Sequence, residues 1–249
     1  MPEYSPEQEI IEQSLEELEY ILQWVRVREG NDENPVTVLI GGWAVDSYNS
    51  YFGSADIDLV TNKATKQHLM WHLVNNRVYE QYRLLGIHTV AKTTHEGKKI
   101  IIDFYNRAKN YHFEGRDEIL NFHILDGNTE LRNIRGNIPV DVPTRSLLFL
   151  FKLKATWDRT YRLEHRTSED AMWERGKLIK DYADILALLD PAHGGTDIDI
   201  AFLGEQFSHF KFLKECLERI SDNLDALTKY GKMDRKTAWE TCEKLLLLL

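Results

Sequence analysis

A short apolar segment that ends in two glycines is the feature that most constrains this chain. Residues 36–40 are β-branched or aliphatic and typical of a strand; Gly41 and Gly42 follow, and Trp43–Tyr51 has the pattern of a helix. Glycines at a strand-to-helix turn let backbone N–H groups approach a phosphate closely, and the helix N-terminus favours negative charge. The segment therefore predicts a turn that binds a triphosphate.

Two acidic residues lie a short distance beyond the glycines. Thirteen residues separate Gly42 from Asp56, and Asp56-Ile57-Asp58 leads into the expected strand Ile57–Val60. Alternation along a strand places Asp56 and Asp58 on one face, with Ile57 buried on the other. Paired carboxylates suit Mg²⁺, which prefers oxygen ligands and usually shares its shell with substrate phosphates.

A third carboxylate is needed to hold a second metal ion and to activate an attacking hydroxyl. Asp103 is the one acid in the apolar strand Lys99–Tyr105, and we expect it to project from the sheet. A second Asp-x-Asp, Asp197-Ile198-Asp199, begins a helical pattern, so we interpret its acids as helix-start residues. The candidate catalytic and metal-binding residues are Asp56, Asp58 and Asp103.

The spacing of apolar residues changes once along the chain. Before Pro143 short strands alternate with helices, and from Pro143 onward the spacing is helical. We expect an α+β fold with an N-terminal helix (1–34), a domain with a small mixed sheet (35–142) and a helical domain that completes its cleft (143–249). The N-terminal helix is expected to start at Ser5; further expected strands are Tyr82–Leu85 and Ile87–Ala91 at the sheet edge, Phe122–Leu125 and Ile138–Val140, and further helices are Lys66–Val74, Ser146–Tyr161 and Trp173–Leu189.

Charge is unevenly distributed along the 249 residues. The 31 Lys and Arg against 40 Asp and Glu leave a net charge of −9, which excludes a uniformly basic surface that coats nucleic acid. Residues 1–34 hold ten acids against two arginines, whereas residues 132–180 hold eleven basic residues against six acids. A polyanion is therefore expected only at the second segment. The candidates for an RNA channel there are Arg132, Arg135, Arg145, Arg162, Arg166 and Lys177.

Cysteine content, apolar runs and the N-terminal pattern indicate the cellular compartment. Two cysteines, Cys216 and Cys242, are too few for a disulfide framework and favour a reducing compartment. The longest apolar run, Leu245–Leu249, is far short of the roughly 20 residues of a membrane span. The acidic N-terminus has no secretory-signal pattern. We expect a cytoplasmic protein that does not contact membranes.

The glycine turn, the Asp-x-Asp pair and the lone strand Asp, at this spacing, resemble the DNA-polymerase-β-type nucleotidyltransferase superfamily. The resemblance implies a nucleotidyltransferase fold, a small mixed β-sheet with flanking helices, followed by an α-helical domain. It also implies two Mg²⁺ ions, or Mn²⁺, and transfer of NMP from an NTP to a hydroxyl with release of pyrophosphate. Gly41, Gly42 and Ser54 would then hold the phosphates, and Asp103 would draw the proton from the acceptor hydroxyl.

The helical half narrows the resemblance. Lys152, Thr156 and Arg159 lie at i, i+4 and i+7, so one helix face presents two cations to a triphosphate. This block and the later Lys180-Asp181-x2-Asp184 resemble the AbiEii-type toxins of type IV toxin–antitoxin systems. In that family the corresponding lysine and last aspartate, here Lys152 and Asp184, are functional. The resemblance implies an acceptor on RNA, tRNA in particular, or on a protein hydroxyl, and an antitoxin protein as a partner.

Two alternatives stay open. Gly-Gly-Trp-Ala-Val-Asp is also similar to the aminoglycoside and lincosamide nucleotidyltransferases, which modify a hydroxyl of a small antibiotic. Both branches usually carry an arginine four residues before the first catalytic Asp, where this chain has Phe52, although Ser54 keeps the hydroxyl position two before it. The missing cation also favours a module that binds nucleotide without chemistry.

Overall fold

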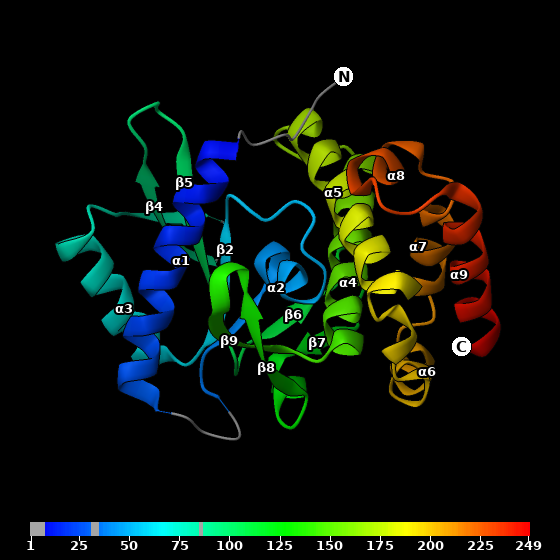
Figure 1. The fold of residues 1–249 in the computed structure, drawn as a ribbon, viewed down its shortest axis with the longest axis horizontal. Helices are drawn as coiled ribbons and strands as arrows, with labels where there is room; N and C mark the ends of the chain where they lie inside the picture. Colours follow the sequence, from blue (N-terminus) through cyan, green and yellow to red (C-terminus); the bar gives the residue numbers. More distant parts are fainter. Residues whose placement is uncertain (1–7, 31–34, 85–86) are drawn as a thin grey trace. The chain divides into compact units, whose positions relative to one another are not determined.

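The computed structural model describes residues 8–30, 35–84 and 87–249, and its fold is α+β, as the sequence predicts (Figure 1). The described chain divides into two compact units. We call residues 8–110 and 121–144 the sheet unit, and residues 111–120 and 145–249 the helical unit. The three expected domains, 1–34, 35–142 and 143–249, stay a prediction. The expected helix start at Ser5 lies outside the described residues.

The sheet unit is built on a mixed five-stranded sheet. Its strands are β1 (Val38–Ile40), β2 (Ile57–Thr61), β3 (Glu80–Leu84), β4 (Ile87–Thr93) and β5 (Lys99–Asn106). They lie in the order β1-β2-β5-β4-β3, and β2 and β5 run parallel while the other neighbouring pairs are antiparallel. Because parallel neighbours need a long crossover, the chain forms helix α3 (Lys63–Asn76), β3 and β4 before it returns as β5.

Helix α1 (Gln8–Glu29) belongs to the sheet unit and buries one face there. Ile11 and Leu18 of the expected apolar stripe are buried, as the helical spacing predicts. The same face also buries Ser14 and Glu17, which an apolar period does not predict. Polar groups at such positions need partners inside the fold, because burial removes their water.

Glu17 finds those partners just after α3, on β4 and just before β3. Its Oε1 lies 2.6 Å from Arg77 Nη2 and 2.7 Å from Lys92 Nζ, and its Oε2 accepts a hydrogen bond from the Tyr79 hydroxyl at 3.1 Å. Burial opposes the charge of Glu17, but the two cations lower its pKa below the ordinary value. The carboxylate therefore ties α1 to the far end of the sheet.

Helix α2 (Gly41–Tyr48) starts on the first glycine, two residues earlier than Trp43, and ends before the expected Tyr51. Behind it lies a hairpin of β8 (Thr129–Ile134) and β9 (Ile138–Pro143), joined by the 3₁₀ turn η2 (Arg135–Asn137). The Tyr48 hydroxyl at the end of α2 donates to the Pro143 carbonyl at 2.7 Å and also contacts Glu130. Side chains of α2 thus hold the hairpin against the helix.

Two local expectations in the sheet unit are wrong. Phe122–Leu125 is the 3₁₀ helix η1 rather than a strand, because the Asn121 side chain accepts a hydrogen bond from the His123 N–H and caps it. Strand β4 is not at the edge of the sheet, since it pairs with β3 on one side and with β5 on the other. Short apolar segments do not reveal which strands become their neighbours.

The helical unit holds the C-terminal half of the chain. The ribbon of β6 (Asn110–His112) and β7 (Ile119–Asn121) leads into and out of its segment 111–120. Its helices are α4 (Arg145–Glu164), α5 (Ala171–Leu189), α6 (Ile200–His209), α7 (Leu213–Ile220), α8 (Leu224–Tyr230) and α9 (Arg235–Leu248), with 3₁₀ turns η3 (Pro191–His193) and η4 (Gly195–Asp197) before α6. Asp199 caps α6 by accepting from the Phe202 N–H, which confirms the helix-start interpretation of that acid.

Among the described residues, none of the helices combines the length and the apolar character that crossing a membrane requires.

Glu17→Gln should destabilise the protein by about 2–3 kcal/mol, because two cations lose a buried partner. The folded-state pKa of Glu17 lies below its unfolded value, so its stabilisation is present at neutral pH and is lost as pH falls through the carboxyl range, roughly pH 4 and below. Urea unfolding of wild type and variant across that range should show a deficit that shrinks with acidification. The exposed neighbour Glu16→Gln is the control and should stay within about 0.5 kcal/mol. An equal, pH-independent loss in both variants would contradict this account.

Candidate functional site

Asp58 and Asp103 occupy one row across the sheet. The parallel register of β2 and β5 makes their Cα atoms direct partners, so the two side chains leave the same face on adjacent strands. Both are half-buried, whereas Ile57 and Ile102, which face the other way, are fully buried. The structure thus brings together two of the three acids that the sequence singles out.

Asp56 lies outside strand β2, in the bend that precedes it. The strand alternation expected to align it with Asp58 therefore does not apply at this position. Asp56 is half-buried, and its backbone N–H donates to the Ser54 hydroxyl at 3.3 Å, while Ser54 itself is buried. The loop, rather than the sheet, positions both residues.

Gly41 packs directly against the Asp58 carboxylate. Its φ of +72° lies in the left-handed region that glycine adopts at little cost. A Cβ at this position would lie 2.8 Å from Asp58 Cγ and would overlap Oδ2. Gly42, the second residue of α2, is buried. The glycine turn and the strand acid therefore form one structure, which only glycine permits at position 41.

Thr89 is a site residue that sequence reasoning missed. It is the register partner of Asp103 on β4, is buried, and its Oγ1 donates to Asp103 Oδ1 at 2.6 Å. The bond fixes the orientation of one carboxylate oxygen in the row. No local pattern marks Thr89, because its role depends on the pairing of β4 with β5.

The donor chemistry of this row fits a hard divalent cation, since carboxylate oxygens are what Mg²⁺ and Mn²⁺ prefer. Asp58 and Asp103 lie side by side as register partners on neighbouring strands. In the described part of the chain, however, no three His, Cys, Asp or Glu side chains are grouped as ligands of one metal ion. Convergence of Asp56 with the other two acids therefore stays a prediction.

Lys152 and Asp184 form an ion pair inside the helical unit. Lys152 Nζ on α4 lies 2.6 Å from Asp184 Oδ2 and 2.9 Å from Asp181 Oδ1 on α5, and Lys180 Nζ donates to both oxygens of Asp184 at 2.9 Å. All four residues are buried. The sequence-predicted pair is thus brought together, in a contact that binds the two helices to each other.

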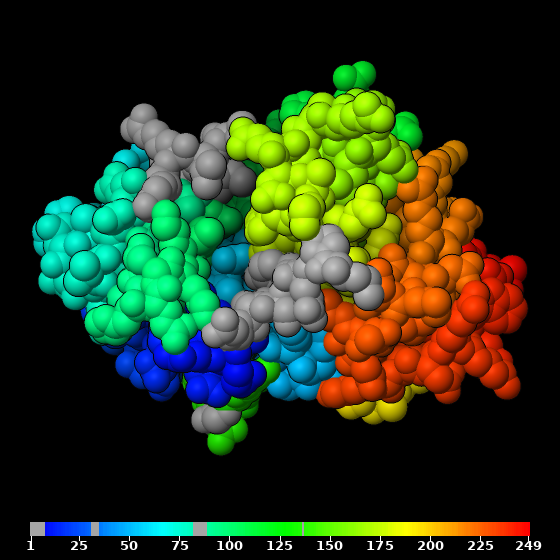
Figure 2. All heavy atoms as spheres, turned by 90° about the horizontal axis from the view of Figure 1, so that it is seen from above, coloured from blue at the N-terminus to red at the C-terminus, as the bar shows by residue number. Residues whose placement is uncertain are grey.

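Arg159 extends the same network toward the surface. Its Nε lies 2.8 Å from Asp181 Oδ2 and its Nη1 lies 2.7 Å from Glu174 Oε1, a carboxylate that Arg162 shares at 2.8 Å. The guanidinium also lies over the ring of Trp173, an exposed residue in the first turn of α5. The end of α4 and the start of α5 form part of the yellow-green surface in Figure 2. Nucleotide binding by Lys152, Arg159 and Asp184 stays a prediction.

The electrostatics of this network follow from burial and pairing. Burial alone would raise the pKa of Asp181, but Lys152 and Arg159 hold it well below its usual range. Burial would lower the pKa of Lys152, yet Asp181 and Asp184 raise it above the ordinary value. Lys180 has its pKa lowered by burial, which Asp184 offsets only in part. The mutual pairing of Lys152 and Asp181 therefore favours the charged forms of both residues at neutral pH.

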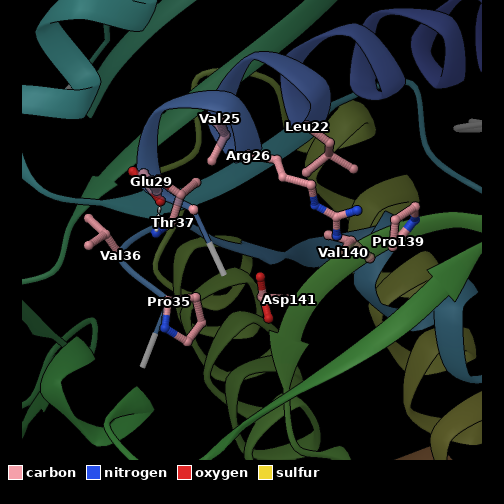
Figure 3. A pocket seen from close by; sticks show the side chains of 11 residues that line it. Leu22, Val25, Arg26, Glu29, Pro35, Val36, Thr37, Pro139, Val140 and Asp141 are labelled. Carbon is pink, nitrogen blue, oxygen red and sulfur yellow. Dashed lines mark hydrogen bonds between the residues drawn. The ribbon is translucent and has the colours of Figure 1, made fainter. Parts of the chain in front are cut away.

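A small cavity of the sheet unit lies between α1, the segment before β1, and β9 (Figure 3). Figure 3 shows Arg26 and Asp141 reaching into it from the helix and from the strand. The pKa of Asp141 lies above its ordinary value, mainly because of burial. Arg26 lowers this pKa and Glu29 raises it. None of the sequence-predicted site residues lines this cavity, so it is not the candidate site.

No protein-family profile and no curated protein sequence match this chain. Among solved structures, one that aligns is the crystal structure of an antigenic nucleotidyltransferase-like protein from Paracoccidioides brasiliensis, at 11% identity and a TM-score of 0.44. The alignment covers 95% of this chain and 93% of that one. The proposed function therefore rests on this chain's own sequence motifs and on the geometry of its residues.

Gly41→Ala should cost more stability than a glycine substitution that changes only backbone strain. Gly97, in the β4–β5 turn, has φ +79° with nothing within 4 Å of its Cβ position, so Gly97→Ala carries the left-handed penalty alone, about 1–2 kcal/mol. Gly41→Ala adds the overlap with Asp58, and we expect about 1–3 kcal/mol beyond the Gly97 value. Denaturant unfolding of both variants measures the difference. Equal losses would show that Gly41 does not press on Asp58.

Asp184→Asn should destabilise the helical unit by about 3–5 kcal/mol, because two buried lysines lose a shared carboxylate. The control is Asp222→Asn, whose pair with Arg235 has side chains 70% and 64% exposed, and which should cost at most about 1 kcal/mol. Circular dichroism during urea unfolding gives both values. A loss for Asp184→Asn no larger than that of the control would refute the buried pairing.

Proposed function

We propose that this chain transfers the nucleoside monophosphate of an NTP to a hydroxyl acceptor and releases pyrophosphate. The observation that carries the proposal is the row in which Asp58 and Asp103 are register partners on parallel strands, with Gly41 packed on Asp58. A turn suited to phosphate and two carboxylates suited to a divalent cation thus occur together within the sheet unit.

A divalent cation, Mg²⁺ or Mn²⁺, is part of this proposal. Asp58 and Asp103 would hold it, and Asp56 would supply the third carboxylate, as in the two-ion site implied by the superfamily resemblance. When bound, such a cation polarises phosphate oxygens and offsets the charge that develops on the leaving pyrophosphate. The observation in favour is the oxygen-only donor set on adjacent strands.

The protein's own groups would divide the remaining work. Asp103 would accept the proton of the acceptor hydroxyl, with Thr89 Oγ1 keeping its Oδ1 in place. Gly41, Gly42 and the buried Ser54 would orient the β and γ phosphates. Lys152, Arg159 and Asp184 would contribute to nucleotide binding, and their ion pairs give them a further role in holding α4 to α5.

The acceptor is proposed to be a hydroxyl of RNA, tRNA in particular, or of a protein, as in a type IV toxin with an antitoxin partner. The sequence resemblance supports this choice. Of the basic residues expected to line an RNA channel, Arg132 and Arg145 donate to backbone carbonyls, and Arg135 and Arg162 donate to carboxylates of the protein. These contacts already engage the four arginines within the protein, whereas a protein acceptor would not depend on them.

A nucleotide-binding module without chemistry is the second candidate. The observation that favours it is the lack, within the described residues, of a group of three carboxylates arranged for one ion. Phe52, which stands where the resembling families have an arginine, points the same way. In that case the glycine turn would bind the nucleotide, and no nucleoside monophosphate would be transferred to an acceptor.

Incubation of the full chain with each α-labelled NTP, Mg²⁺ and either total RNA or a proteome should give labelled product with one acceptor class. Asp58→Asn and Asp103→Asn should reduce transfer at least 100-fold, because each removes a proposed metal ligand. Asp197→Asn is the matched control, since Asp197 belongs to the second Asp-x-Asp and is exposed in η4. It should keep wild-type transfer within about twofold.

Calorimetry with the same NTP and Mg²⁺ separates the two candidate functions. Heat of binding without label transfer from any NTP would establish the binding module and reject the transferase. Transfer that survives Asp58→Asn unchanged would reject the proposed site.

A further inference from the structure

Arg135 reaches from the turn of the β8–β9 hairpin to the glycine-turn helix α2. Its Nη2 donates to Asp46 Oδ1 at 2.9 Å and its Nε donates to Asp46 Oδ2 at 3.2 Å, a two-pronged contact. The Asp46 side chain is 1% exposed, and Arg135 is 29% exposed. A buried carboxylate that accepts two hydrogen bonds from one guanidinium forms a rigid contact, because the planar guanidinium fixes both distance and orientation.

The same guanidinium lies over the loop that follows α2. Residues 49–56, between α2 and β2, form no regular helix or strand. Arg135 Nε also donates to Ser50 Oγ at 3.3 Å, and Ser50 in turn donates to Asp46 Oδ1 at 3.2 Å. A Cβ added to Gly53 would lie 3.2 Å from Arg135 Nη2, so the loop backbone passes directly beneath the arginine.

Trp43 completes the enclosure of this loop. Arg135 lies over its ring, 5.5 Å from the centroid, and a Cβ on Gly53 would lie 3.2 Å from the ring and 2.8 Å from Ile11 Cγ2. Gly53 has φ +82°, so a small residue is required here for conformation and for space. A loop that lacks the regular backbone hydrogen bonds of a helix or strand depends on such side-chain contacts to keep a single conformation.

We propose that Arg135 is a positioning residue that orders the loop carrying Ser54 and Asp56. This inference rests on the proposed function, in which those two residues orient phosphates and complete the metal site. Ser54 follows Gly53 directly and Asp56 follows two residues later, and the Asp56 N–H is bound to the Ser54 hydroxyl, so a shift of the loop at Gly53 moves both together. Arg135 therefore acts through Asp46 and the loop at Gly53 rather than on the reacting atoms.

The matched control is Arg132, on strand β8 of the same hairpin. It donates to the Ser47 carbonyl at 3.1 Å and lies 4.1 Å over the Tyr48 ring, so it also binds α2, yet it has no contact with residues 50–54 among the described contacts. Substitution of either arginine weakens the hairpin–helix contact. Only substitution of Arg135 should disturb the loop.

The test compares Arg135→Gln, Arg135→Lys and Arg132→Gln in the full chain by kinetics and by amide hydrogen exchange. We expect Arg135→Gln to lower kcat at least tenfold with a smaller change in KM for the NTP, and to speed exchange at residues 50–56 at least tenfold. Arg135→Lys keeps the positive charge but cannot make the bidentate contact. It should therefore recover only part of the kcat and only part of the protection from exchange. Arg132→Gln should leave this exchange within twofold.

Asp46→Asn provides a second, independent arm. Because the two side chains act as one contact, the double variant Arg135→Gln with Asp46→Asn should lose no more activity than Arg135→Gln alone. Exchange at 50–56 in Arg135→Gln equal to that in Arg132→Gln overturns the positioning role, whether or not the chain turns over NTP. A wild-type chain with no turnover, but with exchange that depends on Arg135, rejects the proposed function and leaves the ordering of the loop established.

Discussion

The parallel pairing of β2 with β5 is the constraint on which the candidate site depends. It sets Asp58 beside Asp103 in one row, with Thr89 of β4 on the far side and Gly41 packed on Asp58. A parallel pair cannot be made by a tight hairpin, so the chain must complete α3, β3 and β4 first. A slip of one residue between β2 and β5 would turn one of the two carboxylates to the opposite, buried face.

Local chemistry in the sequence predicts much of this sheet unit. The two glycines before a helix predict the turn at Gly41, and a single acid in an apolar strand predicts that the Asp103 side chain projects from the sheet. Residues that act through distant partners could not be predicted. Thr89 is a site residue only because β4 pairs with β5, and Arg135 meets Asp46 from 89 positions away. Strand order and side-chain pairing across the fold leave no mark in a local pattern.

The helical unit shows the same limit for charge. A helix face with Lys152 and Arg159 predicts cations directed at a ligand, but the spacing does not show that α5 supplies Asp181, Asp184 and Glu174 to the same face. Burial makes these pairs costly unless every charge has a partner, and the network provides one to each. The basic character of residues 132–180 is therefore largely directed inward, which the net charge of a segment does not reveal.

Electron paramagnetic resonance of Mn²⁺ tests the central claim most directly, that Asp58 and Asp103 hold a divalent cation together with a nucleotide. Mn²⁺ is titrated into the full chain with and without a non-hydrolysable NTP analogue. The account predicts Mn²⁺ binding that the analogue strengthens, and that a variant with both Asp58→Asn and Asp103→Asn loses. Mn²⁺ binding that the analogue does not change, or that the double variant retains in full, would contradict it.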